Sequence, residues 1–244
     1  MLVLDQRDKR PLYSKNTDAV VPIASITKLM TAMVVLDSHA PLAERVTVTD
    51  AEVDEIKHTR SRLRIGTTLT RDELLRLALM ASENRAAAAL ARVHPEGFRS
   101  FVAAMNQKAI ELGMWHSRFI DSTGLSSDNV STAEDLAKMV EGAYSYPLIR
   151  EYTTQTGYSV MLNNGRTIDY RNSNGLVKST QWQIGLSKTG YIAEAGRCLV
   201  MQARIAATPV VIVLLDSWGK QTRIGDANRI KKWIESQLLR APAG

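Results

Sequence analysis

The chain has little of what several protein classes require. Its single cysteine, Cys198, cannot form an internal disulfide, which excludes a disulfide-stabilised scaffold. Cys198 lies in an apolar run and is interpreted as a buried strand residue rather than a catalytic thiol. The most apolar segment, residues 209–215, is far shorter than the roughly 20 residues of a membrane-spanning helix. Only 6% of residues are aromatic and no Lys/Arg run exceeds two, so a nucleic-acid-binding surface is not indicated.

Several catalytic signatures are absent as well. The four histidines, at positions 39, 58, 94 and 116, form no HExxH motif and lie near no cysteine pair, so we expect no metal. The sequence contains no GxGxxG motif and no P-loop, and we expect no cofactor. Residues 185–189 (GLSKT) differ from a GxSxG motif at the last position. Ser-His-Asp chemistry therefore has no local support.

What is present is typical of an ordinary globular domain. The chain has 244 residues, of which 45% are hydrophobic and 23% charged, enough for one large domain or two closely joined subdomains. Its formal net charge of +6 indicates a mildly basic surface and identifies no partner. Residues 1–5 show no signal-peptide pattern, so the protein is expected to be either cytosolic or a processed form without its leader.

The order of predicted elements indicates an α+β protein. Short strands come first, followed by a long helical middle, further strands and a terminal amphipathic helix. The predicted strands are 2–4, 12–13, 185–191, 196–205 and 210–216, with a hairpin turn at 163–165 (NNG). The predicted helices are 25–36, one after the capping box at 70–73, 84–93, 98–112, one after a second capping box at 131–134, and 227–239.

The simplest architecture pairs both ends of the chain in one antiparallel sheet, with the helical middle as a lobe on top. We therefore expect a single catalytic domain over residues 1–244. Its sheet subdomain would comprise about 1–36 and 157–244, and its helical subdomain about 37–156.

Three short motifs, SxxK, SxN and KTG, occur in that order and indicate serine-lysine chemistry. SxxK occurs twice where chance gives about 0.8 occurrences, and SxN three times where chance gives about 0.7, so neither motif identifies a site by itself. KTG, at Lys188, occurs once where chance gives about 0.05 occurrences. The KTG motif therefore carries most of the statistical weight.

Of the two SxxK candidates, Ser25 with Lys28 is favoured over Ser217 with Lys220. Ser25 lies at the start of a predicted helix, where residues i and i+3 share one face. The helix N-terminus also supplies free amides and a positive partial charge. Ser217 follows a predicted strand, and Gly219 separates it from Lys220 without a helix to fix the spacing.

A serine nucleophile needs an adjacent base, and a lysine can act as one only when its amine is neutral. Burial and a second cation, Lys188, both favour the neutral form of Lys28. Asn84 could orient Lys28 and the substrate, and Ser82 could relay a proton to the leaving amine.

The strand carrying the KTG motif would bind an extended substrate by strand addition. Lys188 and Thr189 would contact a carboxylate or carbonyl of the substrate, with Gly190 beside them. The backbone amides of Ser25 and Tyr191 would form the oxyanion hole.

These residues together resemble the serine-type D-Ala-D-Ala peptidases among the penicillin-binding proteins, most closely the low-molecular-mass endopeptidases of the 7/8 type. The resemblance covers nearly the whole chain. It includes the segments 21–30 (VPIASITKLM), 78–86 (ALMASENRA), 121–125 (DSTGL), 131–136 (STAEDL) and 188–190 (KTG). It also favours Ser82 as the serine of SxN, and leaves 127–129 (SDN) as a structural turn.

The resemblance implies a β-lactamase/DD-peptidase-like fold, a sheet flanked by N- and C-terminal helices with an all-helical insertion. It implies an acyl-enzyme on Ser25, hydrolysis of D-Ala-meso-diaminopimelate crosslinks in peptidoglycan, acylation by β-lactams and a periplasmic location with the leader missing. Family carboxypeptidases often carry a C-terminal β-domain and an amphipathic anchor, and we expect neither in this chain. The sequence leaves the oligomeric state open.

Three alternatives remain on the same scaffold: a DD-carboxypeptidase, a β-lactamase, or a β-lactam or muropeptide sensor that does not turn over. The β-lactamase is disfavoured because no ExxxN-type segment lies between the SxN and KTG motifs. Arg197, on the strand after KTG, is interpreted as a surface or ion-pair residue rather than a substrate ligand.

Overall fold

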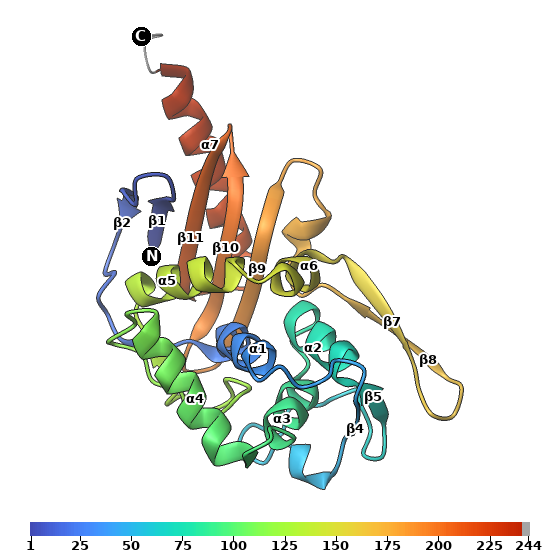
Figure 1. Ribbon diagram of the computed structural model, residues 1–244. Helices are drawn as coiled ribbons and strands as arrows, with labels where there is room; N and C mark the ends of the chain where they lie inside the picture. Colours follow the sequence, from blue (N-terminus) through green and yellow to red (C-terminus); the bar gives the residue numbers. More distant parts are fainter. Residues whose placement is uncertain (241–244) are drawn as a thin grey trace.

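The computed structural model describes residues 1–240 and contains one central sheet with helices on both faces (Figure 1). The sheet consists of β1 (Leu2–Asp5), β2 (Pro11–Ser14), β9 (Gln183–Ile192), β10 (Gly196–Ile205) and β11 (Thr208–Ser217). The helices are α1 (Lys28–Asp37), α2 (Arg71–Met80), α3 (Asn84–Arg92), α4 (Gly97–Glu111), α5 (Ala133–Tyr144), α6 (Pro147–Thr154) and α7 (Thr222–Arg240). Short 3₁₀ turns occur at Ala24–Thr27, Asp50–Glu52 and Gly175–Lys178.

The five strands run in the order β2-β1-β11-β10-β9, and all neighbours are antiparallel. The N-terminal strand β1 lies beside the C-terminal strand β11, with Leu2 opposite Val213. The prediction that both chain ends share one antiparallel sheet is therefore confirmed, as is the α+β class. The β9 strand, which carries the KTG motif, is at one edge of the sheet.

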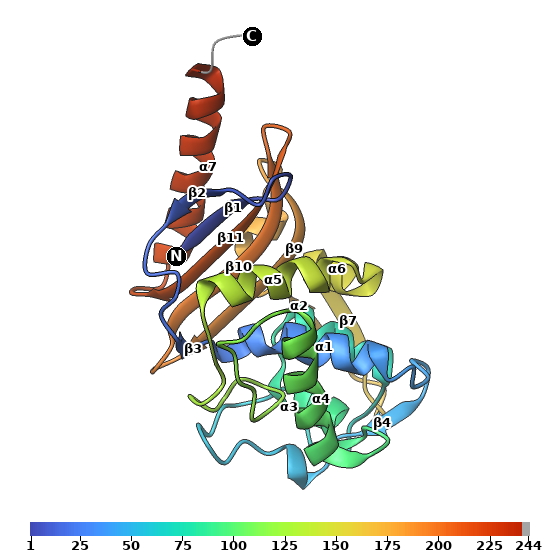
Figure 2. The ribbon, with the colours of Figure 1, turned by 60° about the vertical axis from the view of Figure 1, so that its left-hand side comes forward.

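Alternating residues of the central strands bury two different faces of the sheet. On β10, Cys198 and Val200 pack into the core shared with the helical lobe, whereas Leu199 and Met201 pack into a second core under α7. This is the two-residue period of a strand buried on both sides. Figure 2 shows α5 and α7 on opposite faces of the sheet. The burial predicted for Cys198 is confirmed.

The helical lobe is built around α1. This helix is apolar on nearly all sides and is buried along most of its length, as expected of a helix in the middle of a lobe. It contacts α2, α3, α4, α5 and α6. Because Lys28 is the first residue of this buried helix, its side chain enters the molecule at the junction of lobe and sheet.

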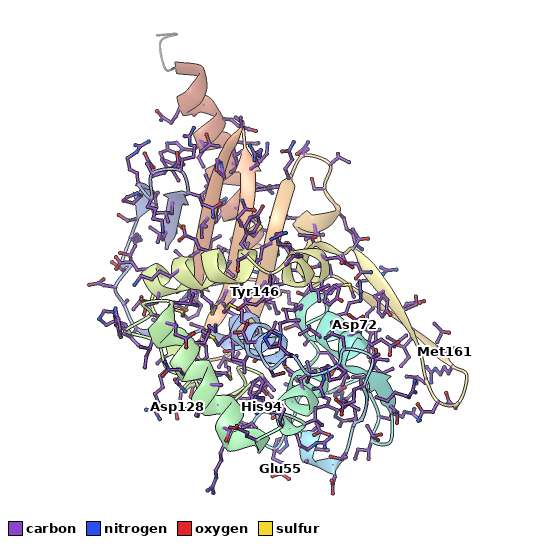
Figure 3. The ribbon with its side chains drawn as sticks, viewed as in Figure 1. Glu55, Asp72, His94, Asp128, Tyr146 and Met161 are labelled. Carbon is purple, nitrogen blue, oxygen red and sulfur yellow. The ribbon has the colours of Figure 1, made fainter. Side chains whose placement is uncertain are left out.

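Three two-stranded pairs complete the fold: β3 (Val21–Pro22) with β6 (Val130–Ser131), β4 (Arg45–Thr47) with β5 (Thr68–Thr70), and β7 (Gly157–Met161) with β8 (Thr167–Arg171). The β7–β8 hairpin turns at the predicted NNG sequence. It projects from the body of the protein, and Met161 near its tip is exposed (Figure 3). No helix within residues 1–240 combines the length and the apolar character needed to cross a bilayer.

Several element boundaries differ from the sequence prediction. The first helix begins at Lys28, because residues 24–27 form a 3₁₀ turn that includes Ser25. The terminal helix begins at Thr222, five residues before the predicted start, and α6 had not been predicted at all. The second capping box was assigned to the wrong residue: Thr132, not Ser131, accepts the hydrogen bond from the backbone N–H of Asp135 at the start of α5.

Replacing Thr132 with alanine should test this assignment. Loss of the cap leaves an N–H of α5 without its partner and should lower the free energy of unfolding by about 1 kcal/mol. Urea denaturation followed by circular dichroism would measure the change. The control is Thr180→Ala, at an exposed turn residue, which should stay within about 0.5 kcal/mol of the wild type. Equal effects of the two substitutions would contradict the cap.

Candidate active site

The three motifs meet where the helical lobe contacts the edge strand β9. The Lys28 Nζ donates to Ser25 Oγ at 2.8 Å, to Asn84 Oδ1 at 2.8 Å and to the carbonyl of Thr123 at 2.7 Å. The Lys188 Nζ donates to Ser82 Oγ at 2.8 Å and to the carbonyl of Thr189 at 2.9 Å. Each lysine therefore holds one serine hydroxyl.

Both lysines are almost completely buried, with exposed fractions of 0% for Lys28 and 1% for Lys188. Burial lowers the pKa of Lys28 to about 7, although the carboxylates of Asp121 and Glu83 act to raise it. Burial lowers the pKa of Lys188 well below its ordinary value, and the positive charges of Lys28 and Arg223 lower it further. Desolvation therefore explains why the amine of Lys28 can be neutral near pH 7. The repulsion between the two lysines chiefly lowers the pKa of Lys188.

The SxN residues are positioned by the tight connection between α2 and α3. Asn84 begins α3, and Glu83 caps that helix by accepting from the backbone N–H of Arg85. Ser82 has a φ of 61°, a left-handed conformation that costs a non-glycine residue roughly 1–2 kcal/mol. This conformation accompanies the hydrogen bond from Lys188, and such strain is typical of functional sites.

Two glycines allow other backbone segments to approach Ser25 closely. A Cβ on Gly124 would lie 1.9 Å from the Ala24 carbonyl oxygen and 2.9 Å from the Ser25 nitrogen. A Cβ on Gly190 would lie 2.9 Å from the Ile23 carbonyl oxygen and 3.2 Å from the same nitrogen. The 121–125 loop and the KTG strand therefore contact the Ser25 segment directly.

A further set of contacts surrounds these residues. The Asn84 amide donates to Thr59 Oγ1 at 3.1 Å, and the Thr189 hydroxyl donates to Ser173 Oγ at 2.8 Å. The guanidinium of Arg223, on α7, donates to the Gly190 carbonyl at 3.0 Å. Burial lowers the pKa of Arg223, and the positive charge of Arg197 adds to this effect.

Four residues of the site, Thr59, Thr123, Ser173 and Arg223, were not predicted from sequence. Thr59, Ser173 and Arg223 belong to no recognisable sequence motif. Thr123 contributes a backbone carbonyl, and the only sequence signal for its position is the Thr-Gly pair of segment 121–125.

The structure brings together all five residues predicted as catalytic, Ser25, Lys28, Ser82, Asn84 and Lys188, and places Thr189, Gly190 and Tyr191 next to them on β9. The Tyr191 ring is exposed, with the Arg197 guanidinium stacked 4.4 Å from its centroid.

The rejected motif candidates lie elsewhere. Asn129 is buried and supports the 121–125 loop, donating to the Asp121 carbonyl and accepting from the Ile120 N–H. Ser217 ends β11, beside the exposed Trp218.

The D-alanyl-D-alanine carboxypeptidase family of peptidases, S11, matches residues 1–219. A D-alanyl-D-alanine endopeptidase of Pseudomonas aeruginosa is 48% identical over 244 residues, covering 99% of this chain and 79% of that protein. A protein of the same name from Escherichia coli is 45% identical with the same coverage.

Among solved structures, the Streptomyces K15 DD-transpeptidase superposes with a TM-score of 0.86 at 28% identity, covering 95% of this chain and 94% of that one. Penicillin-binding protein D2 from Listeria monocytogenes, in its ampicillin-bound form, gives a TM-score of 0.79 at 28% identity with the same coverage.

Replacing Gly124 with alanine should disturb the site through the backbone. The added Cβ cannot coexist with the Ala24 carbonyl, and Gly124 has a φ of +78°, so the 121–125 loop must move away from Ser25. Gly66→Ala is the matched control, because its φ is +84° but no atom lies within 4 Å of the new Cβ. We expect Gly124→Ala to lower the free energy of unfolding by at least about 2 kcal/mol more than Gly66→Ala, measured by thermal or urea unfolding. Equal losses would contradict the close approach.

Proposed function

The chain belongs to the S11 family of D-alanyl-D-alanine peptidases, and from that premise we propose that Ser25 is the nucleophile with which this serine hydrolase cleaves D-alanyl bonds in peptidoglycan. The observation that carries the proposal is the hydrogen bond of 2.8 Å between Ser25 Oγ and the buried Nζ of Lys28. A base that is within hydrogen-bond reach and whose pKa is about 7 is suited to accept the serine proton near neutral pH.

In the proposed acylation step, Ser25 Oγ attacks the D-alanyl carbonyl carbon while neutral Lys28 takes its proton. The backbone N–H groups of Ser25 and Tyr191 stabilise the negative charge that develops on the carbonyl oxygen. The close contact of Gly190 with the Ser25 nitrogen supports this pairing of the two backbone segments. Asn84 orients Lys28 through its side-chain oxygen.

The Ser82 hydroxyl, held by Lys188, then donates a proton to the leaving amine as the amide bond breaks, and the Ser82 oxygen regains a proton from the Lys28 ammonium, which becomes neutral again. Thr189 and Gly190 bind the leaving side of the substrate next to Lys188. Water attacks the Ser25 ester in the second step, releasing the donor carboxylate and returning the proton to the serine.

We further propose that the scissile bond is the D-Ala-meso-diaminopimelate crosslink and that the protein acts in the periplasm. The names of the two bacterial relatives at 45% and 48% identity support endopeptidase over carboxypeptidase activity. The ampicillin-bound structure of the Listeria protein supports acylation by β-lactams.

Intact-mass spectrometry after incubation with benzylpenicillin tests the nucleophile. The wild type should gain one adduct. Ser25→Ala should gain none because it lacks the attacking oxygen, and Lys28→Ala should gain none because it lacks the base. The control Ser217→Ala should react like the wild type. The same four proteins, incubated with crosslinked muropeptide dimers and analysed by liquid chromatography, should show conversion to monomers only for wild type and Ser217→Ala. An adduct on Ser25→Ala would overturn the assignment.

The pH dependence of acylation tests the role of Lys28. Only the neutral amine accepts a proton, and its fraction rises with pH through the pKa of about 7. The second-order rate constant for acylation should therefore rise about tenfold per pH unit below 7 and level off above it. Lys28→Arg keeps a cation at every pH and should lose the rising limb together with at least about a hundredfold of the rate. Stopped-flow measurements between pH 5 and 9 would decide, and a rate that falls with pH over this range would contradict the proposal.

A further inference from the structure

An ion pair joins the two sides of the proposed site. Lys57 lies on the loop that follows the 3₁₀ turn Asp50–Glu52, and its ammonium contacts the carboxylate of Glu194 in the turn between β9 and β10. These residues are 137 positions apart in the sequence. Figure 3 labels Glu55, which lies two residues before Lys57 at the lower edge of the helical lobe. We call Lys57 and Glu194 the cross-site pair.

Each member of the cross-site pair is tied to a catalytic motif. On the lobe side, Thr59 accepts from the Asn84 amide at 3.1 Å, and Asp54 accepts from the backbone N–H groups of Lys57 and Thr59. On the sheet side, Glu194 follows Tyr191 by three residues on the same hairpin. A peptide bound between Asn84 and β9 that extends past Tyr191 toward the β9–β10 turn would approach the pair.

The direction of the bound substrate places its donor half at this end. The scissile carbonyl lies at the Tyr191 N–H, and the leaving side lies toward Lys188 and Thr189. The donor half then runs toward Ile192 and Glu194. At about 3.3 Å per residue along a strand, the residue that precedes the scissile D-Ala lies opposite residues 192–193, within side-chain reach of the cross-site pair.

A cavity of about 360 Å³ lies beside the same loop and offers room for a side chain. Its wall includes the apolar side chains of Ile56 and Leu125 and reaches Asn84 and Thr123 of the catalytic site. The wall also carries acidic residues, among them Asp54, Glu55 and Asp121, and Lys57 and Glu194 lie outside it. A long side chain with an aliphatic stem and an ammonium at its end fits these surroundings. The stem would pack on the apolar atoms, and the end would extend toward the pair.

The cross-site pair itself is suited to exchange partners. Its side chains are 27% exposed for Lys57 and 42% for Glu194, so neither charge is locked in the interior. The Lys57 ammonium beside Glu194 lowers the pKa of that carboxyl, which favours its charged form. A side chain ending in both an ammonium and a carboxylate would satisfy both members at once, whereas a singly charged end would satisfy one of them.

We propose that the cross-site pair recognises the acyl donor, with Lys57 binding the carboxylate and Glu194 the ammonium at the end of a diamino-dicarboxylate side chain such as that of meso-diaminopimelate. This assignment rests on the proposed function, because it takes the orientation of the substrate from the catalytic residues. It makes Lys57 and Glu194 specificity-determining residues for the residue that precedes the scissile D-Ala.

Three synthetic substrates test the assignment. They share one scissile D-alanyl bond and one leaving amine and differ only in the preceding residue: meso-diaminopimelate with both charges, lysine with the ammonium alone, and norleucine with neither. The measured quantity is kcat/KM for each. In the wild type, kcat/KM should fall in that order. Lys57→Gln should reduce the ratio of the diaminopimelate to the lysine substrate about fivefold to tenfold, and Glu194→Gln should reduce the ratio of lysine to norleucine by a similar factor.

The control is Lys9→Gln, which removes the same charge from an exposed ion pair with Glu141 on α5 and should leave both ratios unchanged. If Lys57→Gln and Glu194→Gln lower kcat/KM equally for all three substrates, the pair only holds the loop in place and the assignment is wrong. A wild type that cleaves all three equally well also overturns it. A wild type that cleaves none and forms no benzylpenicillin adduct contradicts the proposed function instead.

Discussion

The burial of two lysine side chains at one junction is the constraint on which the site depends. A buried ammonium is costly, and two adjacent ones are more so, because repulsion adds to the loss of hydration. The fold meets this cost by giving each amine oxygen acceptors: Ser25, Asn84 and the Thr123 carbonyl for Lys28, and Ser82 with the Thr189 carbonyl for Lys188. These acceptors favour the charged amines, but burial outweighs them and lowers the pKa of both lysines, that of Lys28 to about 7. The burial that makes the junction costly therefore also makes a neutral amine available near pH 7.

Elements of both the helical lobe and the sheet contribute residues to this junction. Lys28 comes from the first turn of α1, whereas Lys188 comes from the edge strand β9, which follows much later in the chain. The SxN residues come from the short α2–α3 connection, and Gly124 and Gly190 let two further segments reach the Ser25 backbone. Sheet and lobe are therefore held together at the site itself. A shift of the lobe against the sheet would change the distance between Lys188 on β9 and Ser82 on the α2–α3 connection, whereas Ser25 and Lys28 lie on one helical segment and would move together.

Much of this organisation could be predicted from sequence. Strands β10 and β11, the α2 capping box and the pairing of the chain ends follow from alternation, capping residues and turn signals, which are local. The motif residues Ser25, Lys28, Ser82, Asn84 and Lys188 could be identified because their side chains define the SxxK, SxN and KTG motifs. The short α6 and the early start of α7 could not be predicted, because tertiary packing rather than propensity determines them. The cap at Thr132 was misassigned because Ser131 and Thr132 are equally suited by type, and only the hydrogen bond to Asp135 distinguishes them.

The contributions that sequence did not reveal are of two kinds. Thr59, Ser173 and Arg223 contribute side chains that belong to no motif. Thr123 contributes its carbonyl, and every residue carries a carbonyl, so no side-chain motif can mark it. The neighbouring residues are constrained instead. Gly124, next to Thr123, and Gly190, before Tyr191, must lack a Cβ because the backbone of residues 23–25 lies too close. Tyr191 has an exposed ring stacked on Arg197, and the proposed mechanism uses only its N–H. Along a strand, the side chain and the backbone hydrogen-bonding groups point in different directions, so the ring can change without loss of the N–H. Where backbone atoms form part of a site, glycines in or next to a motif are therefore the sequence signal that indicates them.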